Sequence, residues 1–113
     1  MNFKLLFLFL AMAVTFATVA SAVKNKGAEE LQLPGGVRGN VPFPHHRHQD
    51  VLVDCNICHA LFPQQKGVIA KLKSEGKLDK KYVMNRLCTK CHREKIRAGQ
   101  KSGPISCSDC HIK

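Results

Sequence analysis

The chain has 113 residues, six of them cysteine and six histidine, and carries a formal net charge of +10 at pH 7. A charge of this size is typical of proteins that bind nucleic acid or an anionic membrane surface. Aromatic side chains do not alternate with the basic ones, however, which argues against a surface for single-stranded nucleic acid. The length and the absence of low-complexity stretches indicate one small domain.

Residues 1–22 are predicted to form a secretory signal peptide. Lys4 is followed by an apolar run and by the small-residue triplet Ala-Ser-Ala at 20–22, so the mature chain begins at Val23. A permanent transmembrane anchor is the weaker alternative, because the run is short and no stop-transfer pattern follows it. The first cysteine is Cys55, so the sequence does not support a lipid anchor at this end. We therefore expect export with cleavage, and no membrane insertion afterwards.

Cleavage changes what the composition implies. The mature chain has 17 basic and 8 acidic residues, a net charge of +9, and its only aromatic residues are Phe43, Phe62 and Tyr82. A chain of this size with so few large side chains buries a thin core, and such chains are often stabilised by disulfides, metals or cofactors. We expect a large apolar cofactor to take the place of a side-chain core.

The regular elements are predicted to be few. Residues 23–42 form a polar, glycine-bearing arm in which turn signals allow one short strand pair. A helix of one or two turns is predicted over 66–74 and a longer one over 80–98, with Asp79 as its N-cap. The glycine- and proline-containing stretch 99–104 ends the second helix.

Three CxxCH motifs carry the chemistry of the chain. Two cysteines three residues apart place both sulfurs on one side of a helical turn, and the adjacent histidine offers its ring to a metal. This is the attachment motif of c-type haem, in which five residues supply two thioethers and the proximal iron ligand. We therefore predict three haems c, with thioether sulfurs from Cys55, Cys58, Cys88, Cys91, Cys107 and Cys110. The predicted proximal ligands are His59, His92 and His111.

Zinc and disulfide bonds are the alternative uses of the same cysteines. Three pairs make one and a half four-cysteine zinc sites, and a histidine directly after the second cysteine is poorly placed to join that metal. A disulfide within CxxC closes a very small loop and restrains little of the unfolded chain. Neither alternative accounts for the histidine that follows every pair.

The remaining histidines, His45, His46 and His48, decide the class of function. An iron with one protein ligand is open to substrates and gases, whereas a second protein ligand closes it and favours electron transfer. His45 and His48 are three residues apart, so one helical turn can direct them to neighbouring haems. Any one of the three could instead be an exposed or propionate-pairing side chain.

From Phe43 to the C-terminus the sequence resembles the three-haem cytochromes c7, relatives of the tetrahaem cytochromes c3. The resemblance rests on the segment 43–49 (Phe-Pro-His-His-Arg-His-Gln), on the first two motifs, and on the terminal segment 103–113 with its Gly-Pro pair. No fourth motif is present, which excludes a tetrahaem member. The resemblance implies that His45 is the distal ligand opposite His59, and His48 the one opposite His92.

The third haem is where the sequence departs from this family. Its members usually have a histidine four residues before the second motif, and here that position is Met84. We infer that Met84 is the sixth ligand opposite His111, and a thioether ligand raises the reduction potential relative to imidazole. Two alternatives remain: Met84 packs in a core with Tyr82, Val83 and Leu87, and the third iron takes either His46 or water.

The resemblance implies a small, mostly helical and irregular domain organised by haem over residues 43–113, with a short two-stranded element before it. It also implies a monomeric periplasmic electron carrier, not an enzyme, of the kind found in bacteria that respire metals or sulfur. Its partners would be a membrane quinol oxidase or dehydrogenase on one side, and a terminal reductase or outer-membrane multihaem conduit on the other. The alternative function is a haem enzyme or gas sensor that uses an open third haem.

Overall fold

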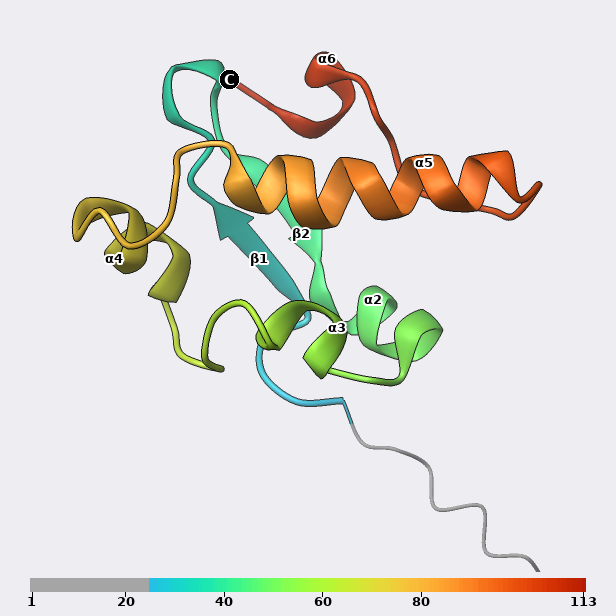
Figure 1. Cartoon of the computed structure of the whole chain (residues 1–113), viewed down its shortest axis with the longest axis horizontal. Helices are drawn as coiled ribbons and strands as arrows, with labels where there is room; N and C mark the ends of the chain where they lie inside the picture. The colour runs from blue at the N-terminus through green and yellow to red at the C-terminus, as the bar shows by residue number, and fades with distance from the viewer. Residues whose placement is uncertain (1–24) are drawn as a thin grey trace, which may run out of the picture.

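The computed structural model describes residues 25–113, so the predicted signal peptide lies outside the described residues. Its strands and longer helices are shown in Figure 1. In chain order the elements are β1 (Glu30–Leu33), the 3₁₀ turn η2 (Gly36–Arg38), β2 (Val41–Pro44), α2 (His45–Leu52), α3 (Asn56–His59), α4 (Val68–Ser74), the π-helical turn η3 (Met84–Cys88), α5 (Thr89–Arg97) and α6 (Cys107–Cys110). The predicted fold class, a small helical and irregular domain with one strand pair, is confirmed.

Strands β1 and β2 form an antiparallel hairpin in which Leu31 pairs with Phe43. A two-stranded sheet has only edge strands, which is why β2 tolerates the prolines at positions 42 and 44. The second strand runs to Pro44, beyond the predicted end of the arm at residue 42. The hairpin therefore leads directly into the histidine-bearing helix α2, which starts at the next residue.

A tight turn separates α2 from the first motif. Val53 has φ 62° and ψ −44°, and the Asp54 N–H donates to the Leu52 carbonyl at 2.6 Å, which makes Val53 the centre of a γ-turn. The Asp54 carboxylate then accepts from the Asn56 N–H at 2.9 Å, where α3 begins. The chain is thus reversed within a few residues, and the first CxxCH follows at once.

The second predicted helix is present but is not uniform. Its first turn closes through the Tyr82 N–H and the main-chain carbonyl of Asp79 at 3.1 Å, so Asp79 contributes its backbone. The next turn, Met84–Cys88, is π-helical, and α5 continues it to Arg97. The shorter helix α4 starts at Val68, two residues later than predicted, after Gly67 at φ +72°.

The side-chain core is as thin as the composition predicts. The buried apolar residues in the described part of the chain are Phe62, Val68, Leu78 and Val83. Partly buried neighbours pack against them, namely Cys58, Leu61, Ile69, Leu72, Leu87 and Cys88. All of these residues come from the segment between Cys58, in the first motif, and Cys88, which begins the second.

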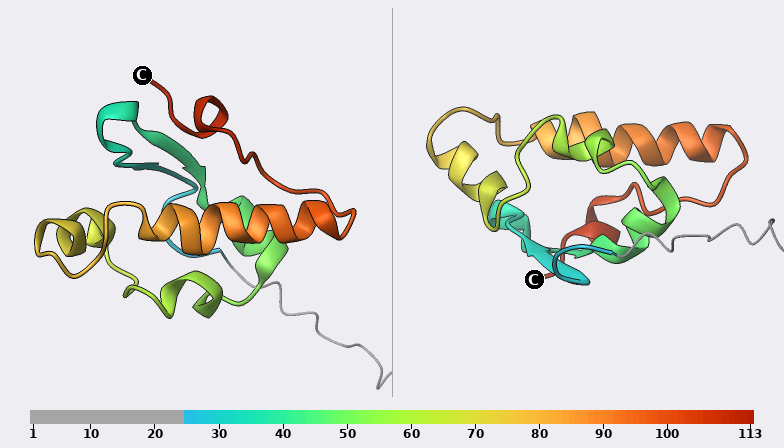
Figure 2. Two further views of the ribbon diagram at one scale, coloured as in Figure 1. Left: turned by 45° about the horizontal axis from the view of Figure 1, so that its top comes forward. Right: turned by 90° about the horizontal axis from the view of Figure 1, so that it is seen from below.

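The rest of the chain is arranged around the long helix. Figures 1 and 2 show α5 running across the molecule, with the hairpin crossing it and α4 near its start. The C-terminal segment returns to the hairpin, where Ile112 forms an isolated antiparallel bridge with Asn40. None of the helices within residues 25–113 has the length and apolar character needed to span a bilayer.

Candidate haem-binding site

Helix α2 brings two of its histidines opposite the first and second motifs. The ring centres of His45 and His59 are 6.3 Å apart, with an angle of 76° between the ring planes. The ring centres of His48 and His92 are also 6.3 Å apart, with an angle of 27°. The fold thus brings together rings that lie 14 residues apart in the first pair and 44 residues apart in the second.

The spacing of both pairs fits two imidazoles on one metal ion. Each metal–nitrogen bond to an imidazole is about 2 Å long. Two such bonds, plus the distance from each ring nitrogen to its ring centre, give a separation close to the observed 6.3 Å. The residues present therefore fit haem iron between the members of each pair.

Five of the six histidines share one hydrogen-bonding arrangement. In each, Nδ1–H donates to a main-chain carbonyl, which leaves Nε2 available for a metal and fixes the ring orientation. The acceptors are Ala28 for His45 (3.1 Å), Pro44 for His48 (2.8 Å), Phe62 for His59 (3.2 Å), Pro104 for His92 (2.7 Å) and Gly39 for His111 (3.1 Å). Sequence reasoning missed these carbonyls, because a main-chain acceptor has no residue signature.

The two phenylalanines of the described chain pack on this constellation. Phe43 lies against the His48 ring with centres 4.3 Å apart, and Phe62 meets the His59 ring edge-on at 5.3 Å. Aromatic contacts of this kind add to the energy of burial and restrict ring rotation. The scarce aromatic residues thus lie beside a distal and a proximal ligand position.

His111 lies between the C-terminal helix α6 and the hairpin. The Ile112 N–H donates to the Asn40 carbonyl at 2.8 Å, which holds the end of the chain beside the turn that also receives the His111 ring. A surface hollow of about 450 Å³ opens at this place and is lined by Arg38, Cys107, Ser108, His111 and Lys113. Its two cationic side chains are suited to pair with carboxylates such as haem propionates.

Two glycines lie directly against motif histidines. A Cβ on Gly103 would lie 2.8 Å from His92 Nε2, and one on Gly35 would meet both the His111 ring and the Gly39 carbonyl. Neither position has room for a side chain. The Gly-Pro pair at 103–104 therefore serves His92 twice, since Gly103 admits the ring and the Pro104 carbonyl accepts its Nδ1 proton.

Met84 and His46 occupy different surroundings. Met84 is half-buried and is not among the side chains of the apolar cluster, although its neighbours Val83 and Leu87 are. His46 differs from the other five histidines, because it donates to a main-chain carbonyl through Nε2 and not through Nδ1; the acceptor is Gly27 at 2.9 Å. Of the three histidines of α2, His45 and His48 therefore donate through Nδ1, whereas His46 donates through Nε2.

The six cysteines of the three motifs form no disulfide bonds with one another. Burial raises the pKa of the Cys88 thiol, and the proximity of Cys58 and Cys110 raises it further. Burial also raises the pKa of Cys58, as does the nearby Cys91.

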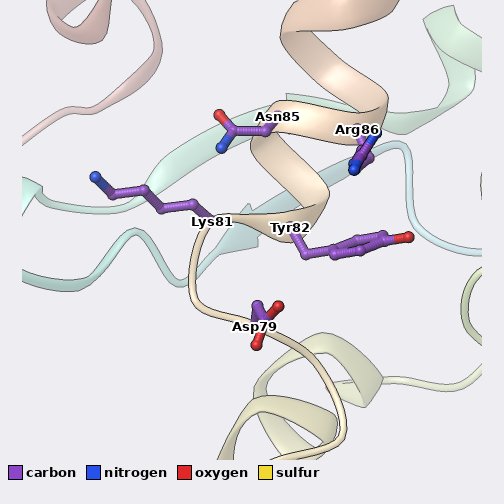
Figure 3. A pocket seen from close by; sticks show the side chains of 5 residues that line it. All are labelled: Asp79, Lys81, Tyr82, Asn85 and Arg86. Atoms are coloured by element: carbon purple, nitrogen blue, oxygen red, sulfur yellow. The ribbon is translucent and has the colours of Figure 1, made fainter.

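A second hollow lies apart from the histidines. It has a volume of about 310 Å³ and is lined by Asp79, Lys81, Tyr82, Asn85 and Arg86, as Figure 3 shows. The Arg86 guanidinium carbon lies 5.9 Å from the centre of the Tyr82 ring, a cation–π arrangement. Its lining includes neither a histidine nor a cysteine, so we assign it no part in cofactor binding.

The fold and the paired imidazoles define the chain as a small multihaem c-type cytochrome. The sequence matches the family described as "Cytochrome c7 and related cytochrome c" over residues 41–112. It is 36% identical over 104 residues to a protein named cytochrome c7 from Geobacter metallireducens, covering 92% of each chain. This chain therefore belongs to the cytochrome c7 family, which confirms the resemblance.

Solved structures agree with this membership. PpcC, a cytochrome c7 from Geobacter sulfurreducens, is 31% identical with a TM-score of 0.53, and the match covers 76% of this chain and 99% of that one. The triheme cytochrome PpcA from the same organism is 30% identical with a TM-score of 0.54, over 76% and 100%. Members of the family are electron-transfer proteins with three c-type haems, and the six cysteines of this chain match that number.

Proposed function

We propose that this chain is a periplasmic electron carrier that moves electrons between membrane-bound donors and a terminal reductase or outer-membrane multihaem conduit. The observation that carries the proposal is that His45 faces His59, and His48 faces His92, with ring centres 6.3 Å apart in both pairs. Iron closed by two protein ligands has no free position for a substrate, and haem supplies a one-electron redox change. The role of the surrounding residues is then to fix the orientation of the ligating side chains.

In this proposal each motif attaches one haem through its two cysteines. The thioether sulfurs come from Cys55, Cys58, Cys88, Cys91, Cys107 and Cys110, and the proximal ligands are His59, His92 and His111. His45 is the distal ligand of the first haem and His48 that of the second. The Nδ1 hydrogen bonds support these roles, because they orient the rings and raise the basicity of the ligating nitrogens.

For the third haem we propose Met84 as the sixth ligand opposite His111. Three observations support it: Met84 is half-buried outside the apolar cluster, His46 is engaged with Gly27, and Met84 begins the π-helical turn. In a regular α-helix Met84 would share a face with Cys88 and His92, which belong to the second haem. A π turn contains an extra residue and so rotates Met84 away from that face.

The proposed location and partners rest on the leader and on charge. A signal peptide at 1–22 would deliver the chain to the compartment in which c-type haem is attached. Within residues 25–113 the single ion pair is Lys77 with Glu75 at 2.8 Å, so most basic side chains are available to partners. We expect a monomer that docks transiently on acidic surfaces of a quinol oxidase or dehydrogenase and of an acceptor.

The proposal is tested on the haem-loaded mature protein. A pyridine haemochrome spectrum should show three c-type haems per chain, and the reduced protein should not bind carbon monoxide. A count below three would contradict the attachment sites. Carbon monoxide binding at one haem would favour the alternative of an enzyme or gas sensor with an open third haem.

A further inference from the structure

The first described residues form a strap across helix α2. The side-chain amide of Gln49 makes two hydrogen bonds to the main chain of Lys26. Its Oε1 accepts from the Lys26 N–H at 3.2 Å, and its Nε2 donates to the Lys26 carbonyl at 2.8 Å. Asn25 Nδ2 donates to Asp50 Oδ1 at 2.8 Å, and the His46 N–H donates to the Glu29 carbonyl at 3.2 Å. His46 Nε2 also donates to the Gly27 carbonyl at 2.9 Å. Residues 25–29 are thus fastened to the helix along their length; we call them the strap.

The strap reaches a ligand position. Its Ala28 carbonyl accepts the Nδ1 proton of His45 at 3.1 Å, and its Gly27 lies against the same ring, where a Cβ would be 3.4 Å from Cε1. The amide nitrogen of Gln49 lies 3.5 Å from the other ring nitrogen, Nε2. The orientation of the His45 ring therefore depends on a segment 17 residues earlier in the chain.

His48 provides an internal comparison. Its Nδ1–H donates to the Pro44 carbonyl at 2.8 Å, four residues earlier and at the start of the same helix. Its ring also packs on Phe43 at 4.3 Å. No strap residue takes part in either contact, so the strap holds one distal ligand position of α2 and leaves the other alone.

The two histidine pairs differ in the angle between their rings. His45 is nearly perpendicular to His59 at 76°, whereas His48 is close to parallel with His92 at 27°. Perpendicular imidazoles interact about equally with two d orbitals of a low-spin ferric iron, which gives a highly anisotropic electron paramagnetic resonance (EPR) spectrum. Parallel imidazoles separate these orbitals and give a rhombic spectrum. Ring angle is therefore a measurable property of each haem.

We propose that Gln49 is a positioning residue for the first haem: by fixing the strap, it keeps the His45 ring nearly perpendicular to that of His59. The proposal rests on the proposed ligand roles of these two histidines. It goes beyond them, because it names the residue and the segment that set the ring angle. Hydrogen bonds to metal-ligating histidines commonly set ring orientation in this way.

The test uses Gln49→Met in the mature, oxidised, haem-loaded protein, with Gln100→Met as the matched control on the exposed residue that follows α5. Gln49→Met removes both bonds to Lys26 and the 3.5 Å amide contact with His45 Nε2, and it keeps the size of the side chain. We expect the most anisotropic EPR signal of the parent protein to shift or be lost, while the rhombic signal of the second haem stays unchanged. Gln100→Met should leave both signals as they are. An unaltered first-haem signal in Gln49→Met would overturn the proposal.

Two further variants keep the outcomes separate. Asp50→Ala is used if Gln49→Met does not load haem, because it removes only the bond to Asn25. The EPR signal of the first haem must then shift in the same direction, but less. An unchanged spectrum of Asp50→Ala overturns the proposal. His45→Ala tests the ligand role itself and should make the first haem high-spin. If His45→Ala leaves all haems low-spin, the proposed ligand set fails. If it acts as expected but the strap variants do nothing, only the positioning role fails.

Discussion

A hydrogen bond from Nδ1 to a main-chain carbonyl is the residue-scale feature that unites five histidines of this chain. It fixes the tautomer, so Nε2 is the nitrogen presented to iron, and it makes that nitrogen a stronger donor. His46 differs because its Nε2 donates to Gly27. His46 and the five histidines of the proposed ligand set therefore differ in which ring nitrogen donates to the backbone.

At the same scale, Met84 is expected to set the potential of the third haem. Met84→His should lower that potential by on the order of 100 mV, within the roughly 0.8 V that axial ligands span, because imidazole favours the oxidised iron more than a thioether does. The measurement is a spectroscopic redox titration of the loaded protein. Leu87→Ala, which removes a packing side chain from the same helix, should leave the potential nearly unchanged. Equal potentials in Met84→His and the parent protein would rule out Met84 as the ligand.

The contact between Gly103 and His92 gives a second prediction for a single residue. Gly103→Ala should displace the His92 ring or strain the loop, since the added Cβ would lie 2.8 Å from Nε2 and 3.0 Å from Nδ1. Overpacking of this kind costs about 1–3 kcal/mol. Denaturant unfolding followed at the haem absorption band should show the loss, with exposed Lys101→Ala as the control. Parent-like stability and an unchanged second-haem spectrum would contradict the contact.

At the scale of elements, short irregular turns do much of the positioning. The γ-turn at Val53 reverses the chain between α2 and α3, the π turn begins at Met84, and the hairpin turn receives His111. A β-branched residue at positive φ is strained, and a π turn is less stable than an α-helical one. Such strain is retained where the surrounding contacts fix the local geometry.

The γ-turn gives a prediction with a matched control. Val53→Gly should leave the free energy of unfolding unchanged or raise it by up to about 1 kcal/mol. Glycine adopts φ 62° without the left-handed penalty of about 1–2 kcal/mol. Its larger conformational entropy in the unfolded state cancels only part of this gain. Val51 is equally exposed, at 64%, but lies within α2. Val51→Gly should therefore destabilise the protein, by about 0.5 kcal/mol.

Denaturant midpoints of the two glycine variants provide the comparison. The expected order of stability is Val53→Gly at or above the parent protein, then Val51→Gly below it. A loss in Val53→Gly equal to that in Val51→Gly would show that the turn at Val53 is not strained.

At the scale of the whole molecule, the small core governs stability. The four apolar side chains that are buried within residues 25–113 cannot offset the conformational entropy of this segment, so bound cofactors must contribute much of the folding free energy. The apolar cluster is also formed by one segment of the chain only, from Cys58 to Cys88. The three haems would supply the apolar contacts for the remainder.

The corresponding prediction concerns the chain without haem. The mature polypeptide produced without covalent haem attachment should show little helical circular dichroism and no cooperative thermal transition. The loaded protein should unfold cooperatively, at a temperature tens of degrees higher than any change in the haem-free chain, as in other small domains that fold with their cofactor. A cooperative transition in the haem-free chain would show that the side-chain core suffices.

Much of the site could be predicted from the sequence because its chemistry is local. A CxxCH motif needs one helical turn to align two sulfurs and a ring, so five residues specify attachment wherever the fold places them. The same holds for the strand pair and the two longer helices, which follow from turn residues and periodicity. The strap could not be predicted, since it depends on contacts with α2, some 20 residues later in the chain.

The sequence by itself therefore determined the cofactor class, the number of motifs and the family of this protein. Only the tertiary structure decided the angle at which the paired rings meet and which carbonyls orient them. The physical reason is the range of the interactions. Covalent attachment and helix periodicity act over a few neighbouring residues, whereas ring pairing requires the N-terminal strap, the hairpin, α2 and α5 to be brought together by folding.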